Sequence, residues 1–279
     1  MRQPCKVWRA SVLLAAIVTL ALMGAGCGSS GGSTKSGASG SSLHLMHQGE
    51  LIVGAEMPVK GFIQLPYSNP SGFEVDLVKA WAKEMKIPKV KWVDAPFANL
   101  FSPAPKNFDM SVQEVTITSQ RAKVVEFSDP YFDANQGLLL RKGTPPTDVK
   151  SFSQLKNLQF GYQATTTGGD YITSKIKPSK SPLEYSTLGA ATQALLNGQT
   201  DAFVMDVPID AQIHQQFPSQ LALIGQFKTG EQYGVVFQKG NPLVKAVNKA
   251  IAATKADGTI KRLQHKWFPG TEHLPTFTP

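Results

Sequence analysis

Between residues 50 and 268, short apolar runs alternate with longer stretches in which apolar residues recur every three or four positions. The short runs predict buried strands, and the periodic stretches predict amphipathic helices that end at Gly198 and Gly258 in two cases. The expected strands cover residues 50–54, 90–93, 108–112, 137–141, 159–163 and 202–205, and the expected helices cover residues 73–85, 151–156, 168–176, 189–196 and 243–256. Strands separated by helices indicate βαβ units and mostly parallel sheets.

Parallel sheets bind ligands outside the carboxyl ends of their strands. The turns after Val53, Val112, Gln163 and Met205 are therefore the places where a site is expected. At about 150 residues per domain, a chain of 279 residues has room for two lobes, each with its own core.

Composition excludes several classes of protein. Apolar residues make up 42% and charged residues 17%, which is typical of a folded globular chain. The formal charge is +8, but the basic residues are scattered, so no nucleic-acid partner is expected. The five histidines show no spacing typical of a zinc site, and no nucleotide-binding Gly-Lys-Ser loop is present, so we expect neither metal nor cofactor.

The N-terminus has the pattern of an export signal. Positive residues at positions 2, 6 and 9 precede an apolar stretch, residues 10–23, that is too short to span a bilayer, so residues 1–26 are predicted to be removed, which lowers the formal charge by three. The segment Leu22–Cys27 resembles the lipobox of bacterial lipoproteins, although Gly24 stands where Leu, Val or Ile is usual. The alternative is an ordinary secretory signal followed by a chance cysteine.

Cysteine usage favours the lipoprotein interpretation. Cys5 lies in the segment to be removed, which leaves Cys27 with no disulfide partner, and acylation gives its thiol a role. The residues that follow are mostly Gly and Ser, a composition typical of a flexible chain. We therefore expect residues 27–47 to be a lipidated cysteine and tether that hold the protein at the extracytoplasmic face of the cell membrane.

Several motifs, all in one order along the chain, carry a family resemblance. They lie at residues 72–77 (GFEVDL), 116–123 (TITSQRAK) with 127–131 (FSDPY), 161–168 (GYQATTTG) and 201–206 (DAFVMD), followed by residues 240–242, 255–259 and 266–268. Together they resemble the amino-acid-binding branch, family 3, of the bacterial extracellular solute-binding proteins that serve ABC importers.

The resemblance implies the type II periplasmic-binding-protein fold, in which two α/β lobes are joined by two hinge strands. Residues 48–137 and 231–279 would form lobe 1 and residues 138–230 lobe 2, with crossings near residues 135–139 and 228–232. It also implies a monomer without enzymatic activity that captures a free L-amino acid and delivers it to an ABC permease complex.

The same motifs suggest how both charges of an amino acid would be matched. Arg121 is the candidate for the carboxylate, because its planar guanidinium can donate two hydrogen bonds to two oxygens. Thr166 and Thr167 would contact the same carboxylate at the start of a helix. Asp206 resembles the family's ammonium-binding aspartate, with Thr116 beside it. Asp76 stands in a motif but is expected to be structural.

The side-chain pocket departs from the family pattern. Glu114 stands where a small residue is usual, Val59 where a stacking aromatic is usual, and Thr165 where glycine is common. The further candidates for ligand contact are Gln113, Glu56 and Gln163, with Phe62 and Phe97 as apolar walls. Acidic groups near the side chain would suit a basic or polar neutral amino acid. The alternative for Glu114 is an ion pair with a nearby Lys or Arg.

Two other functions are alternatives for a chain with this sequence. Some dehydratases of cyclic acids such as prephenate or arogenate share this scaffold, and there Glu114 would act as a general acid. A receptor's sensing module would need a transmembrane helix or signalling domain after Phe268, and neither is visible in the sequence.

Overall fold

The computed structural model describes residues 43–145, 149, 151–269 and 274–277. The predicted signal segment, Cys27 and the tether as far as residue 42 lie outside the described residues. Residues 43–47, also expected in the tether, are held by the fold: the Met46 amide donates to Asp109 Oδ1 at 2.6 Å, and Leu43 and Leu45 pack against the core. The folded body therefore begins earlier than predicted.

The first of two sheets in the described part of the chain has the strand order β2-β1-β3-β10-β4. β1 lies parallel to β2 and β3, and β10 is antiparallel to β3 and β4. The strands are β1 (Glu50–Ala55), β2 (Lys89–Asp94), β3 (Met110–Ser111), β4 (Glu126–Phe127) and β10 (Val236–Phe237). Three predicted strands are thus confirmed, and β4 and β10 were not predicted.

The second sheet has the order β11-β9-β5-β8-β6-β7. Its strands are β5 (Phe132–Arg141), β6 (Phe160–Gln163), β7 (Leu183–Tyr185), β8 (Ala202–Phe203), β9 (Leu221–Tyr233) and β11 (Thr276–Phe277). β11 pairs with β9, so the described C-terminal residues belong to this sheet and not to lobe 1, where the expected division put them. The other expected boundaries stay a prediction.

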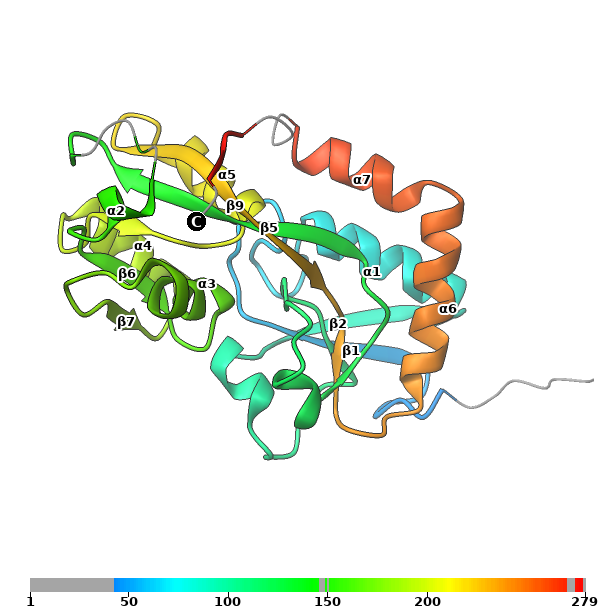
Figure 1. Cartoon of the computed structure of the whole chain (residues 1–279). Helices are drawn as coiled ribbons and strands as arrows, with labels where there is room; N and C mark the ends of the chain where they lie inside the picture. The colour runs from blue at the N-terminus through cyan, green and yellow to red at the C-terminus, as the bar shows by residue number, and fades with distance from the viewer. Residues whose placement is uncertain (1–42, 146–148, 150, 270–273, 278–279) are drawn as a thin grey trace, which may run out of the picture. The chain divides into compact units, whose positions relative to one another are not determined.

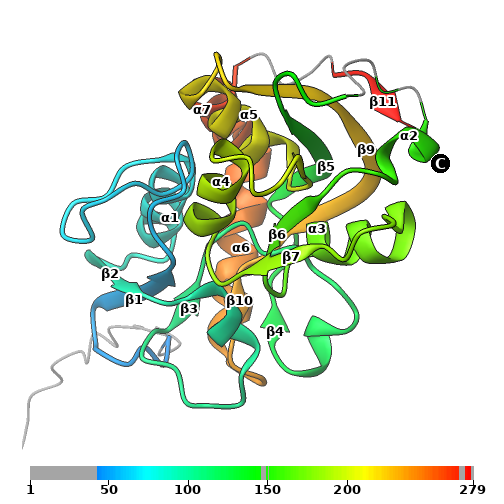
Figure 2. The same cartoon turned by 90° about the vertical axis from the view of Figure 1, so that its left-hand side faces the viewer.

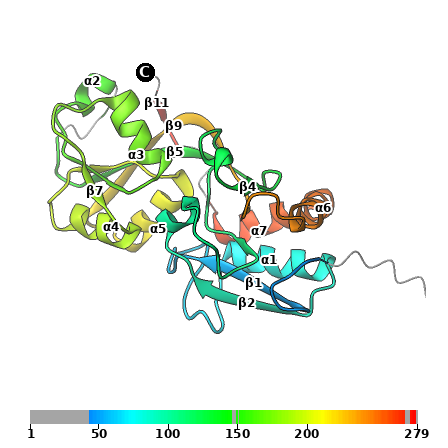
Figure 3. The same ribbon diagram turned by 90° about the horizontal axis from the view of Figure 1, so that it is seen from below.

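The helices fall into two groups. Helices α1 (Phe73–Glu84), α6 (Leu243–Ala256) and α7 (Thr259–Trp267) lie near β1 and β2, and α2 (Phe152–Leu155), α3 (Thr167–Tyr171), α4 (Leu188–Leu196) and α5 (Val207–Gln216) lie with the second sheet (Figure 1). Short 3-10 helices cover Phe97–Phe101 and Arg121–Lys123, and a π-helical turn, Ile172–Ile176, follows α3. The lower view shows the same two groups (Figure 3).

β5 and β9 connect the two groups. They pair antiparallel from Phe132 with Tyr233 to Arg141 with Leu221, with irregularities in register near residue 135 and near residue 138. Both run from one helix group to the other (Figures 1 and 2). The structure therefore confirms two lobes joined by two strands, and the joining strands are longer than the short crossings that the sequence predicted.

Local sequence explains where the best predicted helices begin and end. In α1 the apolar positions face the core and Glu74 and Asp76 lie in the first turn, where acidic groups favour the helix dipole. Gly72 precedes it at φ 139°, and a Cβ there would come within 2.0 Å of the Phe62 carbonyl oxygen, so only glycine fits. The Thr187 hydroxyl caps α4 by accepting from the Ala190 amide at 3.1 Å.

Asp76 has the structural role that was expected. Its Oδ2 accepts from Lys266 Nζ at 2.7 Å and from Trp267 Nε1 at 3.0 Å, which ties α1 to α7. Among the described residues, no helix is both long and apolar enough to cross a membrane.

Candidate functional site

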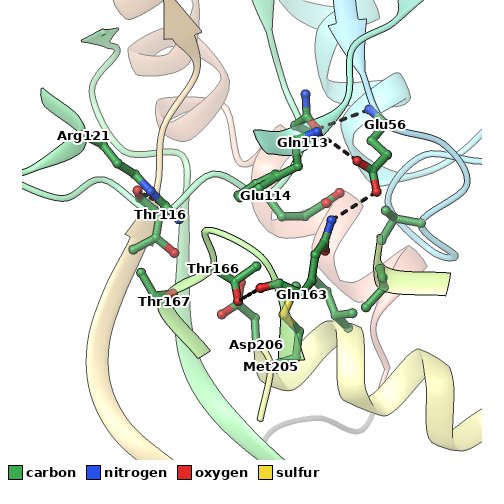
Figure 4. A pocket seen from close by; sticks show the side chains of 14 residues that line it. Glu56, Gln113, Glu114, Thr116, Arg121, Gln163, Thr166, Thr167, Met205 and Asp206 are labelled. Carbon is green, nitrogen blue, oxygen red and sulfur yellow. Dashed lines mark hydrogen bonds between the residues drawn. The ribbon is translucent and has the colours of Figure 1, made fainter. Parts of the chain in front are cut away.

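A pocket lies where the carboxyl ends of strands from both sheets meet. Residues following β1, β3, β6 and β8 all line it, as predicted for the turns after these strands. Of the residues predicted to contact the ligand, only Phe62 does not line the pocket. The others all do: Glu56, Phe97, Gln113, Glu114, Thr116, Arg121, Gln163, Thr166, Thr167 and Asp206. Val59, Leu188, Met205 and Ile209 complete the lining. Figure 4 shows these side chains converging from both lobes.

Phe62 was wrongly expected to be a pocket wall. Its side chain is fully buried, with ring centroids 6.0 Å from Phe73, 5.9 Å from Phe132 and 4.5 Å from Phe268. It therefore belongs to an aromatic cluster of the core.

Arg121 is held at the pocket by two aromatic rings and two backbone carbonyl groups. The guanidinium carbon lies 4.8 Å from the centroid of the Phe101 ring and 5.5 Å from that of Phe97, within the range of cation–π attraction. Nη1 donates to the Thr116 carbonyl at 2.7 Å and Nη2 to the Thr165 carbonyl at 2.8 Å. These bonds use two of the five guanidinium N–H donors. Burial lowers the pKa of Arg121, and Asp206 opposes that shift.

Two residues that depart from the family pattern have a left-handed backbone. Thr165 has φ 63° and Glu114 has φ 53°. Residues other than glycine rarely adopt this conformation, least of all a β-branched residue such as threonine. A glycine at either position would adopt it with less strain.

Asp206 occupies the start of α5 and is buried. Its Oδ2 accepts from the Tyr233 hydroxyl at 2.6 Å, and its Oδ1 accepts from Gln136 Nε2. Burial, followed by the charge of Glu231, raises the pKa of Asp206 to about 7, while Tyr233, Gln136 and Arg121 favour the ionised form. Because it is buried, Asp206 is not a solvated residue of a surface turn.

Glu231 was not predicted and lies directly behind the pocket. Its Oε2 accepts from Thr167 Oγ1 at 2.7 Å, from Thr116 Oγ1 at 3.0 Å and from Gln136 Nε2 at 3.1 Å. Gln136 and Glu231 both fall in the crossings expected near residues 135–139 and 228–232. That placement in a hinge is the signal from which their proximity to the site could have been inferred.

Glu114 pairs with another acid rather than with Lys or Arg. Its amide donates to Glu74 Oε1 at 3.0 Å, and Glu74 also accepts from the Tyr131 hydroxyl. Burial raises the pKa of Glu74 to about 7, and burial together with the charge of Glu74 raises the pKa of Glu114 well above its usual range. Among the described residues neither acid forms an ion pair with a base. Burial beside a second acid therefore favours the protonated, neutral form of Glu114.

Glu56 and Gln163 join the lobes on the other side of the pocket. Glu56 Oε1 accepts from Gln163 Nε2 at 3.1 Å and its Oε2 accepts from the Phe97 amide at 2.8 Å. The Gln113 amide nitrogen donates to Ser111 Oγ at 2.8 Å, and its oxygen accepts from the Glu56 amide at 3.2 Å. Glu56 and Gln113 therefore support the pocket wall through contacts within the protein.

Thr166 is the N-cap of α3. Its hydroxyl donates to the Gln163 carbonyl at 2.7 Å and accepts from the Gly169 amide at 3.3 Å. Among the described residues no cluster of three or more His, Cys, Asp or Glu side chains could hold a metal ion.

Comparison with known proteins agrees with this geometry. Residues 51–270 match the family model of bacterial extracellular solute-binding proteins, family 3. The chain is 31% identical over 227 residues to the L-cystine-binding protein TcyJ of Escherichia coli K12, which covers 79% of this chain and 83% of that protein. It is 30% identical over 273 residues to the ABC transporter glutamine-binding protein GlnH of Bacillus subtilis, covering 92% and 95%.

A solved structure described as an ancestral arginine-binding protein bound to glutamine superposes with a TM-score of 0.70. It is 32% identical and covers 80% of this chain and 99% of its own. These relatives are named for binding, which agrees with the expectation that the protein is not an enzyme. From the match over residues 51–270 and the shared two-lobed architecture, the chain belongs to family 3 of the bacterial extracellular solute-binding proteins.

Proposed function

We propose that this protein captures a free L-amino acid between its lobes and delivers it to an ABC permease complex. The observation that carries the proposal is that Arg121 and Asp206, one cationic and one acidic, line the same pocket. A zwitterion needs both partners, because a buried charge without one is costly. Arg121 would bind the carboxylate, in competition with the Thr165 carbonyl, and Asp206 would bind the ammonium.

The ligand side chain is proposed to be polar and uncharged rather than basic. Of the acids near the pocket, Glu114 has a pKa raised by burial and by the charge of Glu74, which favours its neutral form, and both oxygens of Glu56 already accept hydrogen bonds. The site thus offers few free carboxylates to pair with a positive charge on the ligand side chain. The glutamine-binding and cystine-binding relatives support a polar ligand.

The finer features of transport rest on the sequence. We infer that the protein works as a monomer anchored at the extracytoplasmic face of the membrane through acylated Cys27. The unpaired cysteine after an export signal, followed by a Gly- and Ser-rich segment, supports this anchor. Relatives named as parts of ABC transporters support the permease partner.

The test is a thermal-shift screen of the purified protein against the twenty L-amino acids, L-cystine, ornithine and citrulline, followed by calorimetry on the best responder. Arg121→Ala should weaken that binding at least tenfold, because losing a hydrogen bond to a charged group costs about 1.5–3 kcal/mol. Arg262→Ala, at an exposed arginine of α7, is the matched control and should bind like wild type.

Two results would contradict the proposal. Equal affinity in Arg121→Ala and Arg262→Ala would exclude the assigned role of Arg121. Turnover of prephenate or arogenate by the purified protein would favour the dehydratase alternative, with Glu114 as the acid.

A further inference from the structure

Three donors converge on a single oxygen of Glu231. Thr116 lies after β3 in the first lobe, Thr167 begins α3 in the second lobe, and Gln136 lies in β5, yet all three donate to Glu231 Oε2 at 2.7–3.1 Å. Glu231 itself is on the other joining strand, β9, where it pairs with Ala134. One carboxylate on a joining strand therefore fixes side chains of both lobes.

The direction of these bonds limits what the two hydroxyls can do. A threonine hydroxyl has one hydrogen to donate and two lone pairs, and an ionised carboxylate only accepts. Because Thr116 and Thr167 each give their hydrogen to Glu231, they can only accept from a further partner. Gln136 Nε2 also lies 3.2 Å from Thr167 Oγ1, but its two hydrogens cannot fully serve Asp206, Glu231 and Thr167 at once, so at least one lone pair of the Thr167 hydroxyl stays available. Both residues line the pocket (Figure 4).

An ammonium and a carboxylate respond to such hydroxyls in opposite ways. An ammonium group has three hydrogens to donate and no acceptor, whereas a carboxylate needs donors. Hydroxyls restricted to accepting are therefore matched to the ammonium and offer nothing to the carboxylate. Gln136 links this arrangement to Asp206, because the same Nε2 donates to Asp206 and to Glu231.

We propose that Glu231 is a positioning residue that orients the Thr116 and Thr167 hydroxyls as acceptors, so that this side of the pocket selects the ligand's α-ammonium and rejects a carboxylate. This inference rests on the proposed function and assigns Thr167 to the opposite end of the amino acid from the one expected from sequence. It also makes the protein discriminate against analogues that lack the ammonium.

The experiment compares two ligands on matched variants. The probes are the L-amino acid that gives the largest thermal shift in the screen above and its 2-deamino carboxylic acid, each measured by calorimetry. Wild type should prefer the amino acid strongly, and Glu231→Gln should reduce that preference at least tenfold, because an amide can turn its N–H groups toward the hydroxyls and free them to donate. Gln232→Ala changes the next side chain on β9, which is exposed and bonds Asp133, and should keep the wild-type preference.

Further variants keep the inference testable if Glu231→Gln does not fold. Thr167→Val removes the acceptor and should lower the preference, while Thr167→Ser retains the hydroxyl and should preserve it. A wild-type preference in Glu231→Gln or in Thr167→Val would overturn the inference while leaving the proposed function intact. A wild-type protein that binds no amino acid would overturn the proposed function itself.

Discussion

Asp206 and Glu114 line the same pocket, and burial raises the pKa of both carboxyl groups, but their neighbours differ. Asp206 accepts from Tyr233 and Gln136 and feels the charge of Arg121, all of which favour its ionised form. Glu114 faces a second buried acid, Glu74, and the charges of Glu74, Asp206 and Glu56 raise its pKa further. The surroundings of Asp206 therefore favour an ionised carboxylate more than those of Glu114 do, which makes Asp206 the better partner for a ligand's ammonium.

The largest expected effect comes from replacing the Asp206 carboxylate by an amide, and the same change at Glu114 should have little effect. Asp206→Asn should weaken binding of the best amino acid from the screen by about 10- to 100-fold, because it removes a charged partner of a buried ammonium. Glu114→Gln should change affinity less than about threefold, since a neutral amide of similar shape replaces a carboxyl group whose raised pKa favours its neutral form. Calorimetry near pH 7.5 measures both.

The comparison between the two acids would be broken if Glu114→Gln weakened binding more than Asp206→Asn. Thermal unfolding of both variants should accompany the calorimetry, so that a loss of affinity is not confused with a loss of folded protein.

A smaller effect is expected on stability as a function of pH. The folded-state pKa values of Glu74 and Glu114 are raised, so between pH about 4.5 and 7 the folded state holds protons that the unfolded state has released. Their contribution to stability is therefore full below the unfolded pKa and declines as pH rises through this window. Glu114→Gln removes one of the two acids and should flatten the decline.

The matched control is Glu84→Gln, which makes the same chemical change at an exposed position of the helix that carries Glu74. Melting temperatures from pH 5 to pH 8 should show a shallower slope for Glu114→Gln only. Asp206 and Asp210 contribute in every variant, so the difference between slopes is the quantity to compare. Identical slopes in Glu84→Gln and Glu114→Gln would contradict the neutral-acid assignment.

Local pattern predicted most of the elements, because helices such as α1 and α6 bury one apolar face and strands such as β1 and β6 are buried along most of their length. It missed α5, which begins with Val207-Pro208, although proline is well placed in a first helical turn. It also missed most of β9, because a strand that joins two lobes is polar at many of its exposed positions.

The sequence predicted which residues line the site, but not the protonation of its acids or the direction of its hydrogen bonds. Motif resemblance placed Arg121 and Asp206 at one pocket. The contacts that decide protonation and hydroxyl direction join residues far apart in the chain, such as Glu74 with Glu114 and Thr116 with Glu231. Such contacts depend on the packing of the two lobes, which periodicity and spacing do not encode.

The smallest expected effect concerns the backbone conformation of Thr165. Thr165 holds a left-handed φ of 63°, which costs a β-branched residue about 1–2 kcal/mol, whereas glycine adopts it freely at an entropic cost of about 0.5–1 kcal/mol. Thr165→Gly should therefore raise the melting temperature by about 2–4 °C. The Thr165 carbonyl, which accepts from Arg121, is retained in the variant, so affinity should stay within about twofold.

Gly143→Ala, at a positive φ in open space, is the inverse control and should lower the melting temperature. A Thr165→Gly protein that melts below wild type would show that the threonine side chain, rather than the strained backbone, governs stability at this position.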